Sequence, residues 1–352
     1  MRTKYFNIIR KVAGSKMTYP FLEDWDTIKF MQNSRVMVFL SGFGTKDDEQ
    51  SSLSRKIIDR FPKSSINLQF SSKVCKPLHK AIKDNVQTIV IDHASDDVEH
   101  MQQIYTVAHE NSYIELALKA DCKGISRYRA IVPTFYGWFL NYDASREVRE
   151  KGQSLLLDSF AVKEFADDFR KQIDDSPKDL QDHFSTKELD VGGTMLHCTS
   201  LHYTRDGFEQ YNERVGPSVG RVYQIEVIGF LITPRTFGAR LKLDKHAKEL
   251  WENGDIPCGW EPSKFSPTNG SASKAHLTLE TGPGVQALQT GLDLADLVKL
   301  EVRAQHEGKG DRIPMYNIQN ATLRNYGKGQ AMVYLNEPMP FSFLFSGYNL
   351  KK

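Results

Sequence analysis

The tripeptide His-x-Ser/Thr is the pattern in this sequence that could carry acid–base chemistry. In a strand, residues two apart share a face, so the motif directs an imidazole and a hydroxyl into the same space. The tripeptide alone has little specificity, and its context must choose among the occurrences. It occurs five times, beginning at His93, His183, His197, His202 and His276.

The clearest strand context surrounds His276. Apolar residues alternate with Lys274, His276 and Thr278 across positions 274–279, which predicts a strand that buries one face and presents the other. Lys274 could add positive charge beside a bound anion, and a solvated lysine at a strand edge is an equal alternative.

His197 stands in a second predicted strand, 195–201, which is mostly small and apolar and follows a double glycine. Thr199 shares its face. His202 begins another motif in the same strand with the opposite parity, so regular alternation predicts that His197 and His202 cannot both face one site. The residue pattern alone leaves the choice between these two histidines open.

Two facing His-x-Thr strands could hydrolyse a cyclic phosphodiester. A neutral imidazole would take a proton from water, an imidazolium would give one to the leaving ribose oxygen, and two hydroxyls would hold the non-bridging oxygens. Histidine suits both roles because its reference pKa of about 6.5 populates both forms near neutral pH. The chemistry needs no metal and no cofactor. A single histidine in an apolar strand is better interpreted as structural, and the pair is what favours chemistry.

Length and composition predict a globular protein of two domains. At 352 residues the chain exceeds the roughly 250 to 300 residues at which single cores stop growing. Its net charge of +2 does not indicate a strongly basic nucleic-acid-binding protein. The four cysteines form no Cys-x-x-Cys pair, which favours a reducing, cytoplasmic setting over a zinc ribbon or a disulfide framework. We expect a monomer.

Strands and helices are distributed unevenly along the chain. Predicted strands at 34–40, 86–92 and 113–118 alternate with helices, which predicts a parallel sheet in an α/β domain over residues 1–127. Residues 128–352 are predicted to form an α+β domain with mainly antiparallel sheets. Its predicted strands are 136–140, 195–201, 221–232, 240–243, 275–279, 297–302, 331–335 and 341–345, with helices near 145–158, 161–173 and 285–294.

Neither a membrane span of roughly 18 apolar residues nor a signal peptide is predicted. The first 20 residues are basic, without an acid, and interleaved with apolar residues. They could form an amphipathic helix that targets mitochondria or a membrane surface, and a frayed basic terminus is the simpler alternative. The last four positions contain no cysteine, so prenylation is not predicted.

Several segments in this order resemble the 2′,3′-cyclic-nucleotide 3′-phosphodiesterases of myelin and their fish homologues, within the two-histidine phosphoesterase superfamily. The resemblance covers nearly the whole chain, and the Leu-His-Cys-Thr string matches at His197 rather than His202. It is strongest in the segments 135–140, 196–199, 233–240, 275–279 and 285–294.

This resemblance implies roles for the paired motifs. Thr199 and Thr278 would hold the phosphate, His276 would activate the water, and His197 would act as the acid toward the 3′ oxygen. The product would be a nucleoside 2′-phosphate. The substrates would be 2′,3′-cyclic nucleotides or RNA ends with 2′,3′-cyclic phosphates. The rival hypothesis is an RNA-binding or scaffold protein that uses the phosphate site with little turnover.

The chain departs from its relatives around the expected pocket. Lys274 replaces an arginine, His202 a phenylalanine and Phe135 a tyrosine, so phosphate contact and base stacking are expected to be weaker or altered. Phe135 and Leu288 are candidates to line the nucleotide pocket, with ordinary core packing as the better interpretation of both.

The N-terminal domain of that family resembles polynucleotide kinases and carries a phosphate-binding loop. Here Gly42, Gly44 and Lys46 follow a strand, but acids occupy the positions where Gly-Lys-Ser/Thr should stand, and they would repel phosphates. Asp92 matches the acidic residue that would serve magnesium. We therefore expect a degenerate P-loop kinase-like domain without kinase activity, with a structural or partner-binding role and an unknown partner.

Overall fold

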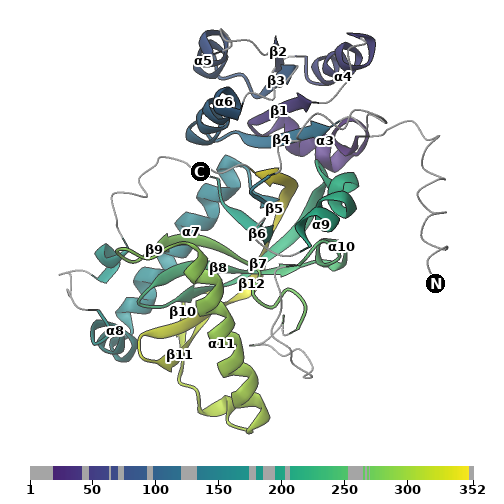
Figure 1. The fold of residues 1–352 in the computed structure, drawn as a ribbon. Coiled ribbons are helices and arrows are strands. Elements are labelled where there is room, and N and C mark those ends of the chain that lie inside the picture. Colours follow the sequence, from purple (N-terminus) through teal and green to yellow (C-terminus); the bar gives the residue numbers. More distant parts are fainter. Residues whose placement is uncertain are drawn as a thin grey trace, which may run out of the picture.

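The computed structural model contains two sheets, one above the other in Figure 1. The first is four-stranded with the order β2-β3-β1-β4, and the second is eight-stranded and includes β5 to β12. The structure describes residues 19–41, 47–62, 65–69, 75–92, 98–119, 133–173, 180–184, 195–202, 207–252, 265, 268 and 270–348.

The first sheet is parallel, as the alternation of strands and helices predicted. Strand β1 pairs in parallel with β3 and β4, and β3 pairs in parallel with β2. The short, half-polar β2 was not predicted. The elements of this part are α2 (Pro20–Glu23), α3 (Trp25–Gln32), β1 (Val36–Ser41), α4 (Asp47–Arg60), β2 (Ser65–Gln69), α5 (Cys75–Lys83), β3 (Thr88–Asp92), α6 (Val98–Glu110) and β4 (Ile114–Lys119).

Both faces of the parallel sheet are covered, which explains the unbroken apolar run of β1. Met37 and Phe39 pack toward α5 and α6, whereas Val38 and Leu40 pack on the other side, toward α3 and α4. That second cluster also takes in side chains of the second sheet.

The second sheet is antiparallel throughout, as expected for an α+β domain. Its elements are β5 (Phe135–Phe139), α7 (Tyr142–Ala161), α8 (Lys163–Arg170), η1 (Leu180–His183), β6 (His197–His202), α9 (Phe208–Val215), η2 (Gly216–Ser218), β7 (Val222–Ile232), β8 (Thr236–Leu243), α10 (Lys245–Lys248), β9 (His276–Thr281), α11 (Leu288–His306), η3 (Gly310–Arg312), β10 (Met315–Ile318), β11 (Ala321–Gly327) and β12 (Gln330–Tyr348).

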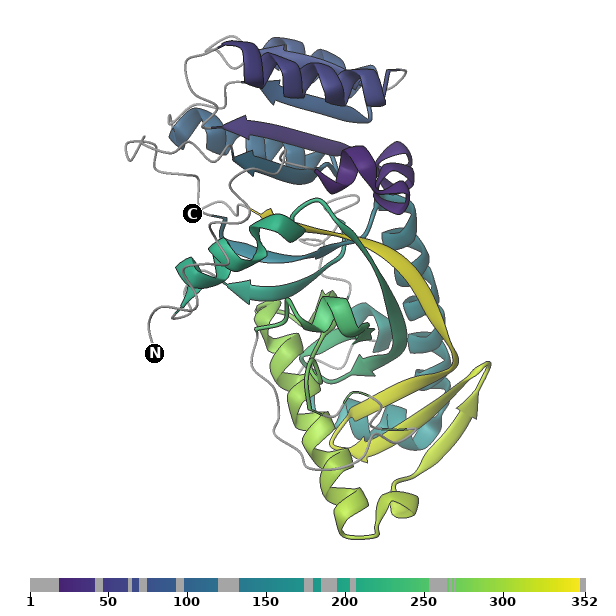
Figure 2. The same ribbon diagram turned by 90° about the vertical axis from the view of Figure 1, so that its right-hand side faces the viewer.

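The long strand β12 lies between the two histidine-bearing strands in the order of the sheet. Its first part pairs with β7, and its last residues, Leu344–Tyr348, pair with β5. The path β6-β5-β12-β7-β8-β9 curls until its two end strands, β6 and β9, are in contact. Figure 2 shows β12 in yellow, rising from the lower part of the second sheet toward the parallel sheet.

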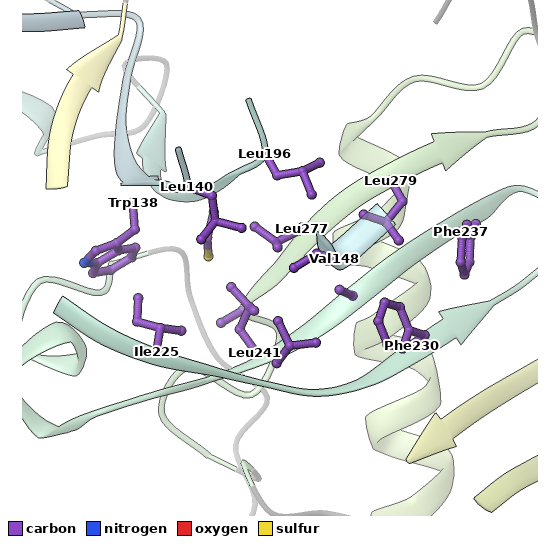
Figure 3. Close-up of a cluster of buried hydrophobic side chains, with 14 of the residues drawn as sticks. Trp138, Leu140, Val148, Leu196, Ile225, Phe230, Phe237, Leu241, Leu277 and Leu279 are labelled. Carbon is purple, nitrogen blue, oxygen red and sulfur yellow. The ribbon is translucent and has the colours of Figure 1, made fainter. Parts of the chain in front are cut away.

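The curled sheet encloses an apolar core. Side chains of β5, β7, β8 and β9 converge with those of α7, as Figure 3 shows. Trp138, Val148, Leu241 and Leu277 are fully buried within it. This core fixes which face of β6 and β9 points inward, and therefore which face presents the histidines.

Two predictions for the C-terminal part were wrong in detail. The strand predicted at 297–302 lies inside helix α11. Valines and leucines alternate there, but the buried positions of α11, including Leu294, Leu297, Val298 and Glu301, recur every three or four residues. The strands predicted at 331–335 and 341–345 form the single strand β12, which changes register between Tyr334 and Met339.

Several expectations lie outside the described residues. The predicted domain boundary near 124–130 falls within 120–132, so the division into 1–127 and 128–352 stays a prediction. The basic N-terminal residues 1–18 and the last four residues are likewise outside. Among the helices that are described, none combines the length and apolar character of a membrane-crossing segment.

Candidate functional site

Strand β6 carries the first His-x-Thr pair at one end of the curled sheet. Phe139 is the register partner of His197, and Gly137 is that of Thr199. Cys198, between them, is buried in the core, whereas both flanking side chains keep some exposure. A Cβ at Gly137 would lie 2.3 Å from the Cys198 carbonyl oxygen, so this close approach of β5 to β6 requires glycine.

Strand β6 has a β-bulge at Ser200, and because of it the prediction that His202 faces away from His197 is wrong. Tyr136 pairs with Leu201 and Gly137 with Thr199, which leaves Ser200 as the extra residue. The extra residue reverses the alternation, so His202 shares the face of His197 and Thr199. The Ser200 hydroxyl is held in the core by the Tyr211 hydroxyl at 2.6 Å and by the Leu250 carbonyl oxygen.

Strand β9 carries the second His-x-Thr pair at the other end of the curled sheet. His276 pairs with Arg240 and Thr278 with Gly238. The Nδ1 of His276 lies 2.8 Å from the Lys274 carbonyl oxygen, which assigns the proton to Nδ1 and leaves Nε2 as the basic nitrogen. A hydrogen bond with the backbone of Met195, also two residues earlier, acts on His197 and raises its pKa.

The beginning of helix α11 packs against the side chains of His276 and Thr278. The Thr278 hydroxyl lies 3.0 Å from that of Thr290 and 3.3 Å from the Ala287 carbonyl oxygen. A Cβ at Gly291 would lie 2.8 Å from Cε1 of His276, so the helix backbone packs directly against the imidazole. Sequence reasoning missed Thr290 and Gly291, although a glycine inside an amphipathic helix is a signal of close packing.

The two ends of the sheet bring both motifs together. Strands β6 and β9 are in contact, and the backbone of His276 hydrogen-bonds the Cys198 thiol. Burial raises the pKa of that thiol to about 12, so it is not a nucleophile at neutral pH. Since Cys198 faces the core, His197 and Thr199 lie on the outer face of the same strand, beside His276 and Thr278.

Burial lowers the pKa of both imidazoles and so favours their neutral forms in the unliganded protein. Burial, the nearby His276 and then His109 lower the pKa of His197 to about 4. Burial also lowers the pKa of His276, and the charge of Lys274 acts in the same direction. Two neutral imidazoles beside hydroxyl donors can accept protons and receive an anion.

The remaining predicted pocket residues differ in their surroundings. Lys274 and His202 are half-buried, and burial lowers the pKa of His202. Phe135 is a core residue, 2% exposed, whose ring stacks on that of His197 with centroids 4.8 Å apart. Leu288 is 74% exposed at the start of α11, so it does not pack in the core.

The other motif residues lie away from this site or outside the described residues. The Nε2 of His183 is 2.7 Å from the Pro234 carbonyl oxygen, a structural contact. Asp92 is buried at the end of β3, where the Asn67 side-chain amide donates to it at 3.3 Å. Gly42, Gly44, Lys46 and His93 are not described. No cluster of three or more His, Cys, Asp or Glu that could hold a metal is present in the described part of the chain.

Comparison with known proteins identifies the family. The family described as "2′,3′-cyclic nucleotide 3′-phosphodiesterase (CNP or CNPase)" matches residues 132–352, more than half of the chain. A protein of that name from Rattus norvegicus is 24% identical over 394 residues, covering 96% of this chain and 90% of its own. Those from Pongo abelii and Mus musculus are also 24% identical, with the same coverage. The chain therefore belongs to the 2′,3′-cyclic nucleotide 3′-phosphodiesterase family, as the sequence resemblance indicated.

Proposed function

We propose that the chain hydrolyses 2′,3′-cyclic phosphates, of nucleotides or of RNA ends, to 2′-phosphates at the paired His-x-Thr motifs. The observation that carries the proposal is the matched pair itself. Two half-buried imidazoles, each bonded to the backbone two residues earlier, accompany two threonines at the adjoining ends of one sheet. The names of the relatives support the substrate class.

In the proposed reaction, His276 is the general base and His197 the general acid. Nε2 of His276 takes a proton from water as the water oxygen bonds to phosphorus. The bond from phosphorus to the 3′ oxygen breaks, and His197 gives its proton to that oxygen. The hydroxyls of Thr199 and Thr278 donate to the non-bridging oxygens, for which Thr278 turns away from its contact with Thr290.

Because the pKa of His197 is lowered in the free protein, the bound substrate must raise it for the imidazole to be protonated and act as the acid. A phosphate charge about 4 Å from an imidazole stabilises the imidazolium by about 4 kcal/mol at an effective dielectric constant of about 20. This corresponds to a pKa rise of about 3. The rise would bring His197 from a pKa of about 4 to near neutrality in the complex. Neither imidazole needs a metal for this chemistry.

The test is phosphorus NMR of the products formed from 2′,3′-cyclic AMP in the presence of EDTA. The intact protein should make only the 2′-phosphate, and His197→Ala and His276→Ala should each lower turnover at least about a hundredfold. His246→Ala, an exposed histidine on α10, is the control and should retain activity. Absent turnover, or turnover that survives either substitution, would refute the mechanism and favour an RNA-binding or scaffold role.

A further inference from the structure

The N-terminal domain packs on the same sheet face that presents His197. In the pairing of β12 with β5, Leu344 lies opposite Phe139 and Tyr348 opposite Phe135. Phe139 is in turn opposite His197 on β6. Cross-strand partners project from the same face, so Leu344, Tyr348 and His197 share one surface. That surface packs into the apolar cluster formed with α3, β1 and β4.

Side chains at the end of β12 make polar contacts with the N-terminal domain. The Ser346 hydroxyl donates to the Glu115 carbonyl oxygen on β4. The Tyr348 hydroxyl is hydrogen-bonded to Nδ1 of His109, in the last turn of α6. Burial raises the pKa of Tyr348 far above its usual value, with a further contribution from the charge of Glu115, so the phenol stays protonated.

The ring of Tyr348 also belongs to an aromatic stack that includes the imidazole of His197. The Tyr348 and His197 rings are nearly parallel, at 13°, with centroids 6.3 Å apart. Phe135 and Phe139 both stack on His197, at 4.8 and 5.5 Å, and both contact Tyr348. His197 is therefore held by rings whose outermost member is tied to α6.

His109 is also within electrostatic reach of His197. Among the residues that the structure describes, His276 on β9 and His109 on α6 are the titratable groups that act on His197, and both lower its pKa. The phenol of Tyr348 separates His109 from the stack, and the carboxylate of Glu115 acts on that phenol. A group of the N-terminal domain thus influences a histidine of the hydrolytic site.

We propose that His109 and Tyr348 are positioning residues for His197, so that the N-terminal domain is a working part of the hydrolytic site. The proposal rests on the function proposed above. The hydrogen bond to His109 fixes the Tyr348 ring, and that ring, with Phe135 and Phe139, fixes the imidazole of His197 for proton transfer. The parallel-sheet domain then has a role in hydrolysis that does not depend on its phosphate-binding loop.

The test compares His109→Asn, Tyr348→Phe and the double variant in the full-length protein. Tyr348→Phe keeps the ring and loses only the hydroxyl. Each single variant should lower kcat roughly tenfold with KM unchanged. This corresponds to a displacement of the imidazole smaller than the roughly 1 Å that can cost about a hundredfold. The double variant should be no slower than the slower single, since both break one contact.

Ser346→Ala is the matched control, because it removes a contact between the same two domains that does not touch His197. NMR titration of the histidine rings, with His197 assigned from the spectrum of His197→Asn, gives a readout independent of turnover. His109→Asn should raise the pKa of His197, and Ser346→Ala should leave it as in the unaltered protein.

Three outcomes would overturn the inference: kcat within twofold of the unaltered protein in both single variants, losses no larger than that of Ser346→Ala, or a titration of His197 that His109→Asn leaves unchanged. If the unaltered protein itself does not hydrolyse cyclic phosphates, the proposed function fails instead. The titration then still decides whether His109 acts on His197.

Discussion

Gly291→Ala is the most informative substitution in the site, because it should lower activity without lowering stability. A Cβ at position 291 would lie 2.8 Å from Cε1 of His276. Carbon atoms pack favourably at about 3.5 to 4.0 Å, so the imidazole must retreat by roughly 0.7 to 1.2 Å. Alanine at the same time favours the helix by about 1 kcal/mol relative to glycine.

A displacement of about 1 Å in a catalytic group can cost about a hundredfold in rate, or about 2.7 kcal/mol. We therefore expect kcat to fall by roughly that factor while Tm changes little. Steady-state hydrolysis of 2′,3′-cyclic AMP and thermal unfolding followed by circular dichroism measure the two quantities. Gly310→Ala is the control, since an added Cβ there meets nothing within 4 Å.

A Gly291→Ala protein that keeps at least half of its activity would contradict this prediction. An activity loss that simply follows a loss of Tm would contradict it equally. In the first case the position of His276 against α11 is not needed for turnover. In the second case the glycine serves the fold and not the imidazole.

Three further predictions concern pH, phosphate contact and the buried core. Because the pKa values of His197 and His276 are both lowered from 6.5, the singly protonated pair is most populated below that pH. The pH profile of kcat/KM should peak below about 6.5 and fall tenfold per unit above it, and an optimum above pH 7.5 would contradict this. Lys274→Arg should lower KM by a few-fold in the same assay, since a guanidinium binds phosphate in a bidentate manner; an unchanged or higher KM would exclude Lys274 as a phosphate contact. Glu301→Gln should destabilise the fold by about 3 to 5 kcal/mol in urea unfolding, because it leaves the fully buried Arg324 without its ion-pair partner, and a loss below 1 kcal/mol would show that the pair is not needed.

Local alternation predicted the strand that carries His276 and Thr278. The apolar residues around His276 alternate over six positions, and their burial in one core required only that this strand have an inner and an outer face. The parallel sheet was equally predictable, because buried strands between helices have a distinct residue pattern. The strand predicted at 297–302 failed because alternating valines and leucines fit either period over six residues, and only the packing of α11 on β8 and β9 decided between them.

The bulge at Ser200 illustrates what local pattern cannot show. A strand with regular parity would have turned His202 away from His197, and the bulge depends on hydrogen bonds from Ser200 to Tyr211 and Leu250, which are 11 and 50 residues away. Because strand alternation is local, the residue pattern predicted the two His-x-Thr strands and the face on which His276 and Thr278 lie. Three features depend on the packing of the whole chain: β12 lies between the two strands in the sheet, Gly291 lies against His276, and His109 of α6 is hydrogen-bonded to Tyr348 at the end of β12. Those contacts join segments that are far apart in the chain, and their geometry depends on how the whole sheet curls.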